Sequence, residues 1–455
     1  MTRIAALMAV LCAGLLIPAP TALLVPPATP RLLRPAPLFS ATLPPPAAPP
    51  AAFPVDVSSV ARSGLDYRPL ANAPATFPSA RQLKAVIPRD CFKPDTTKSL
   101  SYLALSSVLT SLCVSAGFAA FPHLPPSLLT SPLWALWGLA TGTVGMGLWV
   151  LAHECGHGAF SKNRRLETAV GYTIHSLLLV PYFSWQRSHA VHHLYTNHME
   201  LGETHVPESG TGPLKIRGWL CSTLGPKAGL NVWGAVEGFK HLVLGWPAYL
   251  LIGSTGGPAR GVTSHFSPNP LIKGDAKFKN KELFPGVWKK RVLQSGLGVA
   301  AAVAGLCAWG ASNLPQMLTL YGIPYLTINA WLVLYTWLQH TDVDVPHFTD
   351  SEHSYVKGAL HTIDRPYDKL DPWGLIDRLH HKIGTTHVAH HFDSSIPHYE
   401  AERATNAIKA AYPDLYLYEP TPIPQAFWRV CKGCAAVTKD GDRYVWDNRG
   451  LVEHL

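Results

Sequence analysis

Four long stretches of the chain carry almost no charged residue, and this feature limits its fold more than any other. They cover residues 100–121, 133–152, 292–312 and 318–338. Each is about 20 residues long, which is the length of a helix that crosses the hydrocarbon core of a bilayer. Buried helices of a large soluble enzyme rarely occur as two close pairs of this kind. The sequence therefore predicts an all-α integral membrane protein with about four transmembrane helices.

Two shorter apolar runs lie between the second and third stretches. Residues 170–183 contain His175 and Pro181, and residues 242–252 are interrupted by Pro247. Both runs are too short to span a bilayer as helices. We expect them to form interfacial or re-entrant helices at the membrane surface.

Basic residues outnumber acidic ones, and the formal net charge is +9. They are spread through the loops, as in membrane proteins whose basic loops face the cytosol or stroma and anionic lipid. No nucleic-acid motif accompanies them, so nucleic acid is not expected as a partner. The eight cysteines are scattered, and the CxxC pair of Cys431 and Cys434 lacks the second pair that would complete a zinc site.

The second apolar stretch ends in the sequence HECGH, which holds His153, Glu154 and His157. A spacing of four residues places both imidazoles on one face of a helix, at the edge of the membrane. Two histidines placed in this way can bind a metal ion, as in zinc proteases, where the glutamate acts as a base. This motif alone leaves the identity of the metal open.

Two further histidine clusters have the spacing HxxHH. Each can place three imidazoles on one side of a helix. Together with the first pair they give eight candidate ligands, whereas a mononuclear zinc site uses about four, so the pattern favours two metal ions. Imidazole binds iron, copper and zinc alike, and the ligand type does not choose between these metals. The clusters are His189, His192 and His193, and His387, His390 and His391.

Membrane topology predicts that these clusters meet. If the first two spans form one hairpin and the last two another, all three clusters face the same side of the membrane. His340 ends the fourth apolar stretch on that side and is a ninth candidate, because a polar residue at such a position is often functional. We therefore expect a histidine-rich cap on the cytosolic or stromal side.

At these residues the chain resembles the membrane fatty acid desaturases, especially the oleate (Delta-12, omega-6) desaturases of plants and algae, with the omega-3 desaturases next closest. The resemblance covers nearly all of the chain after about residue 77. The segments that carry it are HECGHGAFS from His153, LLLVPYFSWQRSHAVHH up to His193, WLQHTD from Trp337, and THVAHHFDSSIPHYEAERAT from Thr386.

The resemblance implies a di-iron centre that cycles between Fe2+ and Fe3+, with O2 as co-substrate. No catalytic side chain is expected beyond the metal centre. Glu154 and Gln339 are candidate outer partners that would orient the ligand histidines. The implied ligands are His153, His157, His189, His192, His193, His340, His387, His390 and His391.

Two positions depart from the family pattern. In the related acyl-CoA desaturases an asparagine four residues before the extra histidine binds metal through water, and this chain has Thr336 there. After the third cluster the group usually has apolar residues, whereas this chain has Phe392 followed by Asp393. Residues at that point are expected to line the acyl tunnel, so Asp393 makes the regiochemistry harder to infer. The favoured interpretation of Asp393 itself is a solvated acidic residue in a loop.

The implied activity is the introduction of a cis double bond into a lipid-linked acyl chain, converting oleate to linoleate. The electrons would come from an external cytochrome b5 or ferredoxin, and the acyl chain from a phospholipid or galactolipid. A homo-oligomer is left open. Omega-3 desaturation, hydroxylation and acetylenation are alternatives on the same scaffold. A remote alternative is a non-enzymatic membrane zinc-binding protein, which would leave most of the histidines without a role.

Residues 1–54 are expected to form a leader. Arg3 and an apolar run resemble a secretory signal, and a Pro- and Ala-rich segment without acidic residues follows. Such a combination resembles the bipartite leaders of algae with secondary plastids and favours a plastid membrane; the alternative is an uncleaved tail on an endoplasmic reticulum enzyme. We expect one desaturase domain over residues 77–439, a tail over residues 440–455, and no fused cytochrome b5 domain because an HPGG-type haem segment is absent.

Overall fold

The computed structural model describes residues 77–278, 281–367 and 371–448. The predicted leader lies outside the described residues. Within them, three helices are long and apolar enough to cross a membrane: α3 (Thr96–Ala120), α4 (Ser131–His157) and a 54-residue element over Val287–His340. The chain is therefore an all-α membrane protein, as predicted.

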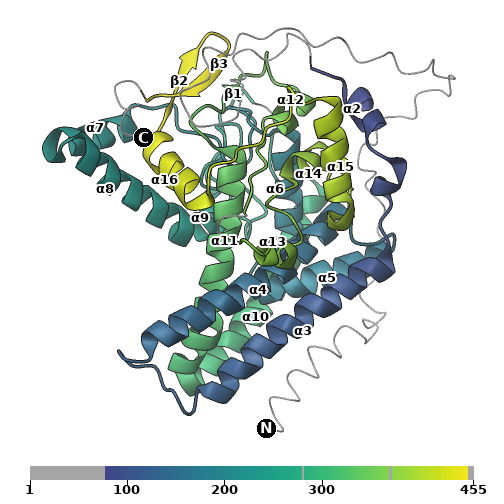
Figure 1. Cartoon of the computed structure of the whole chain (residues 1–455), viewed down its shortest axis with the longest axis vertical. Coiled ribbons are helices and arrows are strands. Elements are labelled where there is room, and N and C mark those ends of the chain that lie inside the picture. The colour runs from purple at the N-terminus through teal and green to yellow at the C-terminus, as the bar shows by residue number, and fades with distance from the viewer. Residues whose placement is uncertain (1–76, 279–280, 368–370, 449–455) are drawn as a thin grey trace. The chain divides into compact units, whose positions relative to one another are not determined.

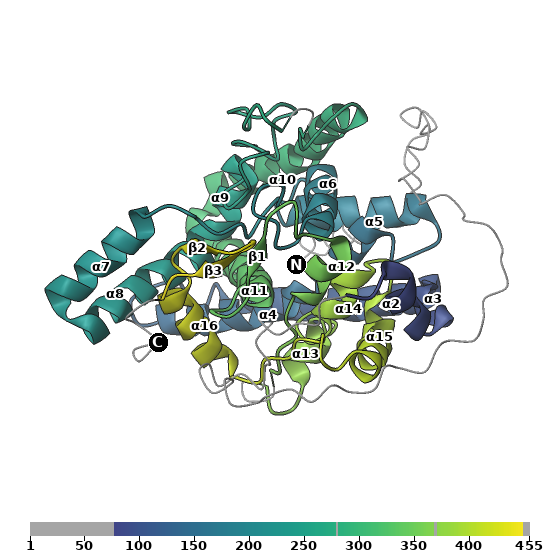
Figure 2. The same ribbon diagram turned by 90° about the horizontal axis from the view of Figure 1, so that it is seen from above.

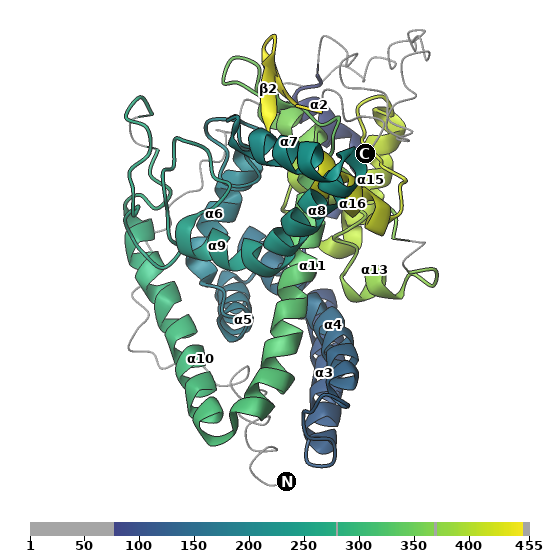
Figure 3. The ribbon, with the colours of Figure 1, turned by 90° about the vertical axis from the view of Figure 1, so that its left-hand side faces the viewer.

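The 54-residue element accounts for two of the four predicted spans. It consists of α10 (Val287–Met317), a π-helical turn η5 (Leu318–Gly322) and α11 (Ile323–His340). At 1.5 Å per residue a straight helix of this length would be about 80 Å long, far more than a bilayer core. The backbone leaves the helical conformation at Asn313, whose side chain accepts a hydrogen bond from the backbone N–H of Gln316. The result is a hairpin, and α10 and α11 diverge from their lower ends in Figure 3.

Helix α3 begins where the side chain of Asp95 accepts hydrogen bonds from the backbone N–H groups of Thr97 and Lys98. Its apolar side chains are largely exposed, Leu112 for example by 62%. Helix α4, in contrast, is buried over most of its length and packs against both α3 and α11. Helix α3 thus offers a lipid-facing surface, and α4 is the central helix of the membrane region.

Glycines allow α4 and α11 to approach each other. A Cβ atom at Gly138 would lie 2.4 Å from Cγ2 of Ile323, and one at Gly142 would lie 2.4 Å from Cβ of Thr327. Small residues four positions apart are the usual way in which membrane helices pack closely, because lipid provides no hydrophobic drive for helix association. This contact sets how α4 and α11 are placed along each other, and both helices end in histidines.

The remaining elements lie mainly beyond the histidine-bearing ends of α4 and α11, above them in Figure 1. Helices α7 and α8 lie side by side at the left of Figures 1 and 2. The elements are α2 (Ala80–Val86), η3 (Arg89–Phe92), α5 (Arg164–Leu177), α6 (Tyr182–Leu194), α7 (Gly212–Leu224), α8 (Pro226–Phe239), η4 (Lys240–Leu244), α9 (Gly245–Ile252), α12 (Tyr355–Leu360), α13 (Leu375–Leu379), α14 (His387–Phe392), α15 (His398–Ala411) and α16 (Ile423–Gly433).

A small antiparallel sheet joins distant parts of the chain. Strand β3 (Arg443–Trp446) pairs with β2 (Val437–Asp440) on one side and with β1 (His347–Phe348) on the other. The boundary expected at residue 439 falls inside β2. Residues 443–446, assigned to a tail from the sequence, therefore pair with the segment that follows α11.

The two shorter apolar runs form no spanning helix. Residues 170–183 cover the second half of α5 and the start of α6, with Pro181 as the residue that precedes α6. Residues 242–252 cover the end of η4 and all of α9, with Pro247 in the first turn of α9. Helices of 14 and 8 residues, as α5 and α9 are, cannot cross a bilayer.

Replacing Gly142 by Val tests the packing of α4 on α11. The added side chain would overlap Thr327 and the carbonyl oxygen of Pro324, so we expect the variant to lose about 1–3 kcal/mol of stability. Thermal unfolding of the detergent-solubilised protein measures this loss as a lower transition temperature. Gly305→Val is the matched control, because a Cβ atom at Gly305 meets no atom within 4 Å. Equal transition temperatures for the two variants would contradict the packing described here.

Candidate metal centre

The first histidine pair lies at the end of α4. His153 is buried and His157 is partly buried, and both rings emerge from the same face of the helix. Helix α4 stops at Gly158, which has a φ of 79°, and the backbone N–H of Ala159 reaches back to the carbonyl oxygen of Glu154. Glycine is favoured at such a left-handed position because it has no Cβ atom. The chain therefore turns away directly after the second histidine.

The other histidines come from three further helices. The second cluster lies in the last two turns of α6, the third cluster lies in α14, and His340 is the last residue of α11. Helix α14 has only six residues. Three of them are the histidines of the third cluster, and all six residues are buried. Ends of four helices thus meet at one place.

Five imidazoles form a first group. One ring nitrogen from each lies within 4.8 Å of the corresponding nitrogen of every other. The Nε2 atom of His153 is 2.9 Å from Nε2 of His189 and 3.2 Å from Nε2 of His157. The Nε2 atoms of His189 and His193 are 3.2 Å apart. The group comprises His153, His157, His189, His193 and His390.

A second group lies beside the first. Its core is His192, His340 and His391, whose ring nitrogens are again within 4.8 Å of one another. The Nε2 atom of His340 is 3.1 Å from Nε2 of His192 and 3.0 Å from Nε2 of His387. The rings of His193 and His391, 4.1 Å apart, join the two groups. The nine histidines singled out from the sequence are therefore brought together as five and four.

The imidazoles are held in their neutral form. Burial lowers the pKa of His192 to about 3, and it lowers the pKa of His189, His193 and His391 well below the ordinary value. A neutral imidazole has one N–H donor and one nitrogen lone pair, and the lone pair is what a metal ion binds.

The nitrogen distances fit metal ions better than hydrogen bonds. One ring nitrogen is either a donor or an acceptor, yet Nε2 of His189 lies within 3.2 Å of both His153 and His193. Nitrogens bound to one ion at about 2.1 Å, with angles between 90° and 100°, lie about 3.0–3.2 Å apart. The buried Nε2 atoms of His390 and His391 have no hydrogen-bond partner among the described residues. Two groups of this kind suit two ions.

Thr196 was not identified from the sequence, although it fixes the orientation of one ring. Its hydroxyl donates to the carbonyl oxygen of His192 at 2.8 Å and lies 3.1 Å from Nδ1 of His391. Because the hydroxyl proton is used, Nδ1 of His391 must donate, which leaves the lone pair on Nε2. A hydroxyl four residues after a histidine of an HxxHH cluster is the signal that could have revealed it.

The two proposed outer partners act in different ways. One carboxylate oxygen of Glu154 lies 3.6 Å from Nδ1 of His153, and the other accepts a hydrogen bond from the backbone N–H of His398. The amide of Gln339 donates to the carbonyl oxygen of Ile383 at 2.8 Å. Among the described residues Gln339 has no hydrogen bond to a ligand ring, so it holds the loop before the third cluster instead.

The two departures from the family pattern have local explanations. The hydroxyl of Thr336 donates to the carbonyl oxygen of Leu332, one turn earlier in the same helix. Asp393 forms an ion pair with Lys84 at 2.5 Å and accepts hydrogen bonds from Ser395. Asp393 therefore stabilises a turn and an interhelical contact near the surface.

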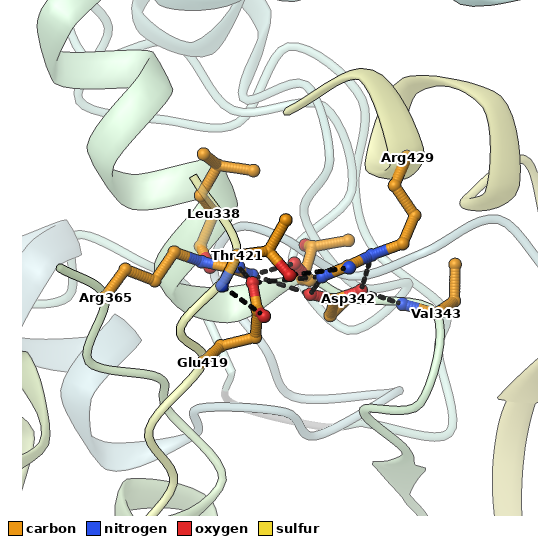
Figure 4. Close-up of polar contacts among 8 residues, drawn as sticks. Leu338, Asp342, Val343, Arg365, Glu419, Thr421 and Arg429 are labelled. Carbon is orange, nitrogen blue, oxygen red and sulfur yellow. Dashed lines mark hydrogen bonds and ion pairs between the residues drawn. The ribbon is translucent and has the colours of Figure 1, made fainter. Parts of the chain in front are cut away.

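Adjacent residues Asp364 and Arg365 hold two ligand-bearing helices. One oxygen of Asp364 accepts hydrogen bonds from the backbone N–H groups of His387 (2.6 Å) and Val388 (3.0 Å), at the start of α14. The guanidinium of Arg365 donates to the carbonyl oxygen of Leu338 at 2.8 Å, near the end of α11 (Figure 4). The position of His387 relative to His340 thus depends on this dipeptide.

Arg365 is fully buried and belongs to a network of four charged side chains (Figure 4). It pairs with Asp342 at 2.8 Å and with Glu419. Arg429 contacts the same two carboxylates, at 2.6 Å and 3.0 Å. Two positive and two negative groups in a buried site are stable only when each keeps its partners.

Replacing Arg365 by Met tests this network. It leaves the buried carboxylates of Asp342 and Glu419 with one cation in place of two, and we expect a loss of about 3–5 kcal/mol. Thermal unfolding of the purified protein reports the loss, and the metal content after purification should fall with it. Arg403→Met is the control, because Arg403 is half exposed and pairs at the surface. If the two variants unfold at the same temperature, the network does not have this role.

Comparison with known proteins identifies relatives over most of the chain. The family model for fatty acid desaturases matches residues 130–421. The Delta(12)-fatty-acid desaturase of Arabidopsis thaliana is 38% identical over 378 residues, which is 82% of this chain and 92% of that protein. An endoplasmic reticulum omega-6 fatty acid desaturase of Brassica juncea is 38% identical over 79% of this chain and 87% of its own length. An oleoyl-12-hydroxylase of Ricinus communis is 36% identical over 82% of this chain and 90% of its own length.

Proposed function

Because this chain belongs to the fatty acid desaturase family, we propose that it introduces a cis double bond into the oleoyl chain of a membrane lipid and so forms linoleate. The observation that supports this most is the meeting of nine neutral imidazoles at the ends of four helices, beside a membrane region. Relatives named as Delta-12 and omega-6 desaturases support the position of the new bond.

The chemistry explains why so many histidines are required. The methylene groups of an acyl chain have no acidic proton and no leaving group, so acid–base side chains cannot remove their hydrogens. A pair of iron ions with O2 and two electrons supplies that oxidising power when bound. In this proposal the five-histidine group and the four-histidine group each hold one ion, with all nine imidazoles as ligands.

The protein residues fix the geometry of the centre. Thr196 sets the orientation of His391, Glu154 lies beside His153, and Asp364 and Arg365 hold α14 against the end of α11. A small displacement of the metal centre from the acyl chain lowers the reaction rate strongly, and one methylene pair must react while its neighbours do not. Precise placement of the ligands is therefore the main contribution of the fold.

A hydroxylase on the same scaffold is the second candidate. The oleoyl-12-hydroxylase of Ricinus communis is nearly as similar to this chain as the desaturases are. The same oxidising centre could leave a hydroxyl group at the first carbon attacked, without forming a double bond. Omega-3 desaturation differs only in where the acyl chain is held, and acetylenation differs in that the attacked carbons already share a double bond. A zinc-binding protein without activity would give none of these products.

The cellular setting is proposed from the leader. A signal-like segment followed by an acid-free segment within residues 1–54 favours a plastid membrane. Ferredoxin would then provide the electrons, and a galactolipid the acyl chain. The alternative is suggested by the reticulum enzymes among the relatives. In that membrane cytochrome b5 and a phospholipid would take these roles.

Expression in a yeast that makes oleate but no diene tests the proposed reaction. We expect 18-carbon dienes with the new bond on the methyl side of the existing one, because the chain is similar to proteins named as Delta-12 and omega-6 desaturases. The same assay distinguishes a diene from a hydroxy acid. Gas chromatography with mass spectrometry of the fatty acid methyl esters identifies the product and the bond position.

The same assay needs an inactive and an active control. His189→Ala removes a ring that lies between two others of the five-histidine group and should form no diene. His123→Ala changes an exposed histidine between α3 and α4 and should keep full turnover. His175 is unsuitable as a control because it is buried against Trp149 and Trp185. An unaltered fatty acid profile, with the parent protein present in membranes, would argue against desaturation.

A fluorescent fusion of residues 1–54 tests the plastid assignment. In an alga with a secondary plastid we expect the fusion to enter the plastid, because a signal alone would not require the acid-free extension. Confocal microscopy with a reticulum marker distinguishes the two membranes. Retention in the reticulum, with the leader uncleaved, would exclude the plastid and leave the proposed chemistry unchanged.

A further inference from the structure

The two histidine groups are unequal in size. The first has five imidazoles, whereas the second has His192, His340, His387 and His391. The related acyl-CoA enzymes use an asparagine and a water molecule at the position of Thr336, but the hydroxyl of Thr336 is bound to its own helix. The second group therefore has one imidazole fewer than the first, and the Thr336 hydroxyl is engaged elsewhere.

A tenth imidazole lies beside the second group. The ring centroid of His205 is 5.0 Å from that of His340 and 5.8 Å from that of His192. The first distance matches the 4.9 Å between the rings of His340 and His387, whose Nε2 atoms are 3.0 Å apart. The planes of the His205 and His340 rings differ by 16°. The His205 ring is thus stacked on His340 and lies next to His192, both members of the second group.

The backbone holds His205 in a conformation that non-glycine residues seldom adopt. Its φ is 56°, and its N–H donates to the hydroxyl of Thr255 at 3.2 Å. The next residue, Val206, donates to the carbonyl oxygen of Thr255 at 2.9 Å. A left-handed conformation at a residue with a large side chain is often kept where that side chain has a role. None of the hydrogen bonds in the described residues engages the imidazole of His205.

We propose that His205 is the fifth imidazole of the second group and binds the same metal ion as His340. The inference rests on the proposed di-iron function, but it concerns the metal shell and can be tested apart from turnover. It divides ten histidines equally between two ions. Spacing in the sequence does not reveal His205, because it lies twelve residues after His193 in a loop without any histidine repeat.

Replacing His205 by Gly removes the ring without straining a backbone of positive φ. Loss of an outer partner of a metal ligand lowers metal affinity by about 10–100-fold. Because His205 is proposed as a direct ligand, we expect its loss to lower the iron affinity of one site by at least this factor. Elemental analysis of the dialysed protein should show the loss of one iron, and the Mössbauer spectrum of protein enriched in 57Fe should show one changed signal and one unchanged signal. Free imidazole should enter the space left by the ring and restore the parent spectrum.

Glu208→Gly is the matched control, because it introduces glycine at an exposed position three residues later in the same loop and keeps the Thr204 hydroxyl that contacts Thr255. It should keep both irons and both signals. The proposal is overturned if His205→Gly keeps the parent iron content and spectrum. It is also overturned if both variants lose iron equally and imidazole restores neither, since the loop alone would then matter. A parent protein with two irons but no diene product would refute the proposed reaction and leave this comparison valid.

Discussion

Nine neutral imidazoles meet at one place, and seven of them direct ring nitrogens at one another over distances of 2.9–3.2 Å. Each of these nitrogens has either one proton or one lone pair, so Nε2 of His189 cannot form hydrogen bonds with both His153 and His193. Metal ions resolve the conflict, because each one accepts several lone pairs at once. The fold must therefore bring four helix ends to one place before the ions can bind.

Two kinds of contact achieve this, one in the membrane region and one beyond it. Glycines of α4 allow α11 to pack closely, which sets the level at which His153 and His340 leave their helices. Beyond the membrane, Asp364 holds the start of α14 and Arg365 holds the end of α11. A buried network of four charges keeps Arg365 in position. The ligand set therefore depends on residues that never touch the metal.

The sequence was enough to predict the spans and the nine clustered histidines, because both are local patterns with a fixed spacing. It could not reveal that Arg365 and Arg429 share Asp342, which lies 23 residues from the first and 87 residues from the second in the chain. Gln339 was expected beside a ligand ring, yet it bonds to a loop, since adjacency in sequence does not fix where a side chain points. Asp393 follows a cluster expected near the acyl tunnel, yet its carboxylate pairs with Lys84, 309 residues earlier in the chain, a partner that no local pattern indicates.

X-ray absorption and elemental analysis of the purified protein test the central claim most directly, because they report the identity of the metal and its ligands without any substrate. The account predicts about two iron ions per chain, each surrounded by imidazole nitrogens at about 2.1 Å. A single zinc ion per chain, or iron bound mainly by sulfur, would contradict it.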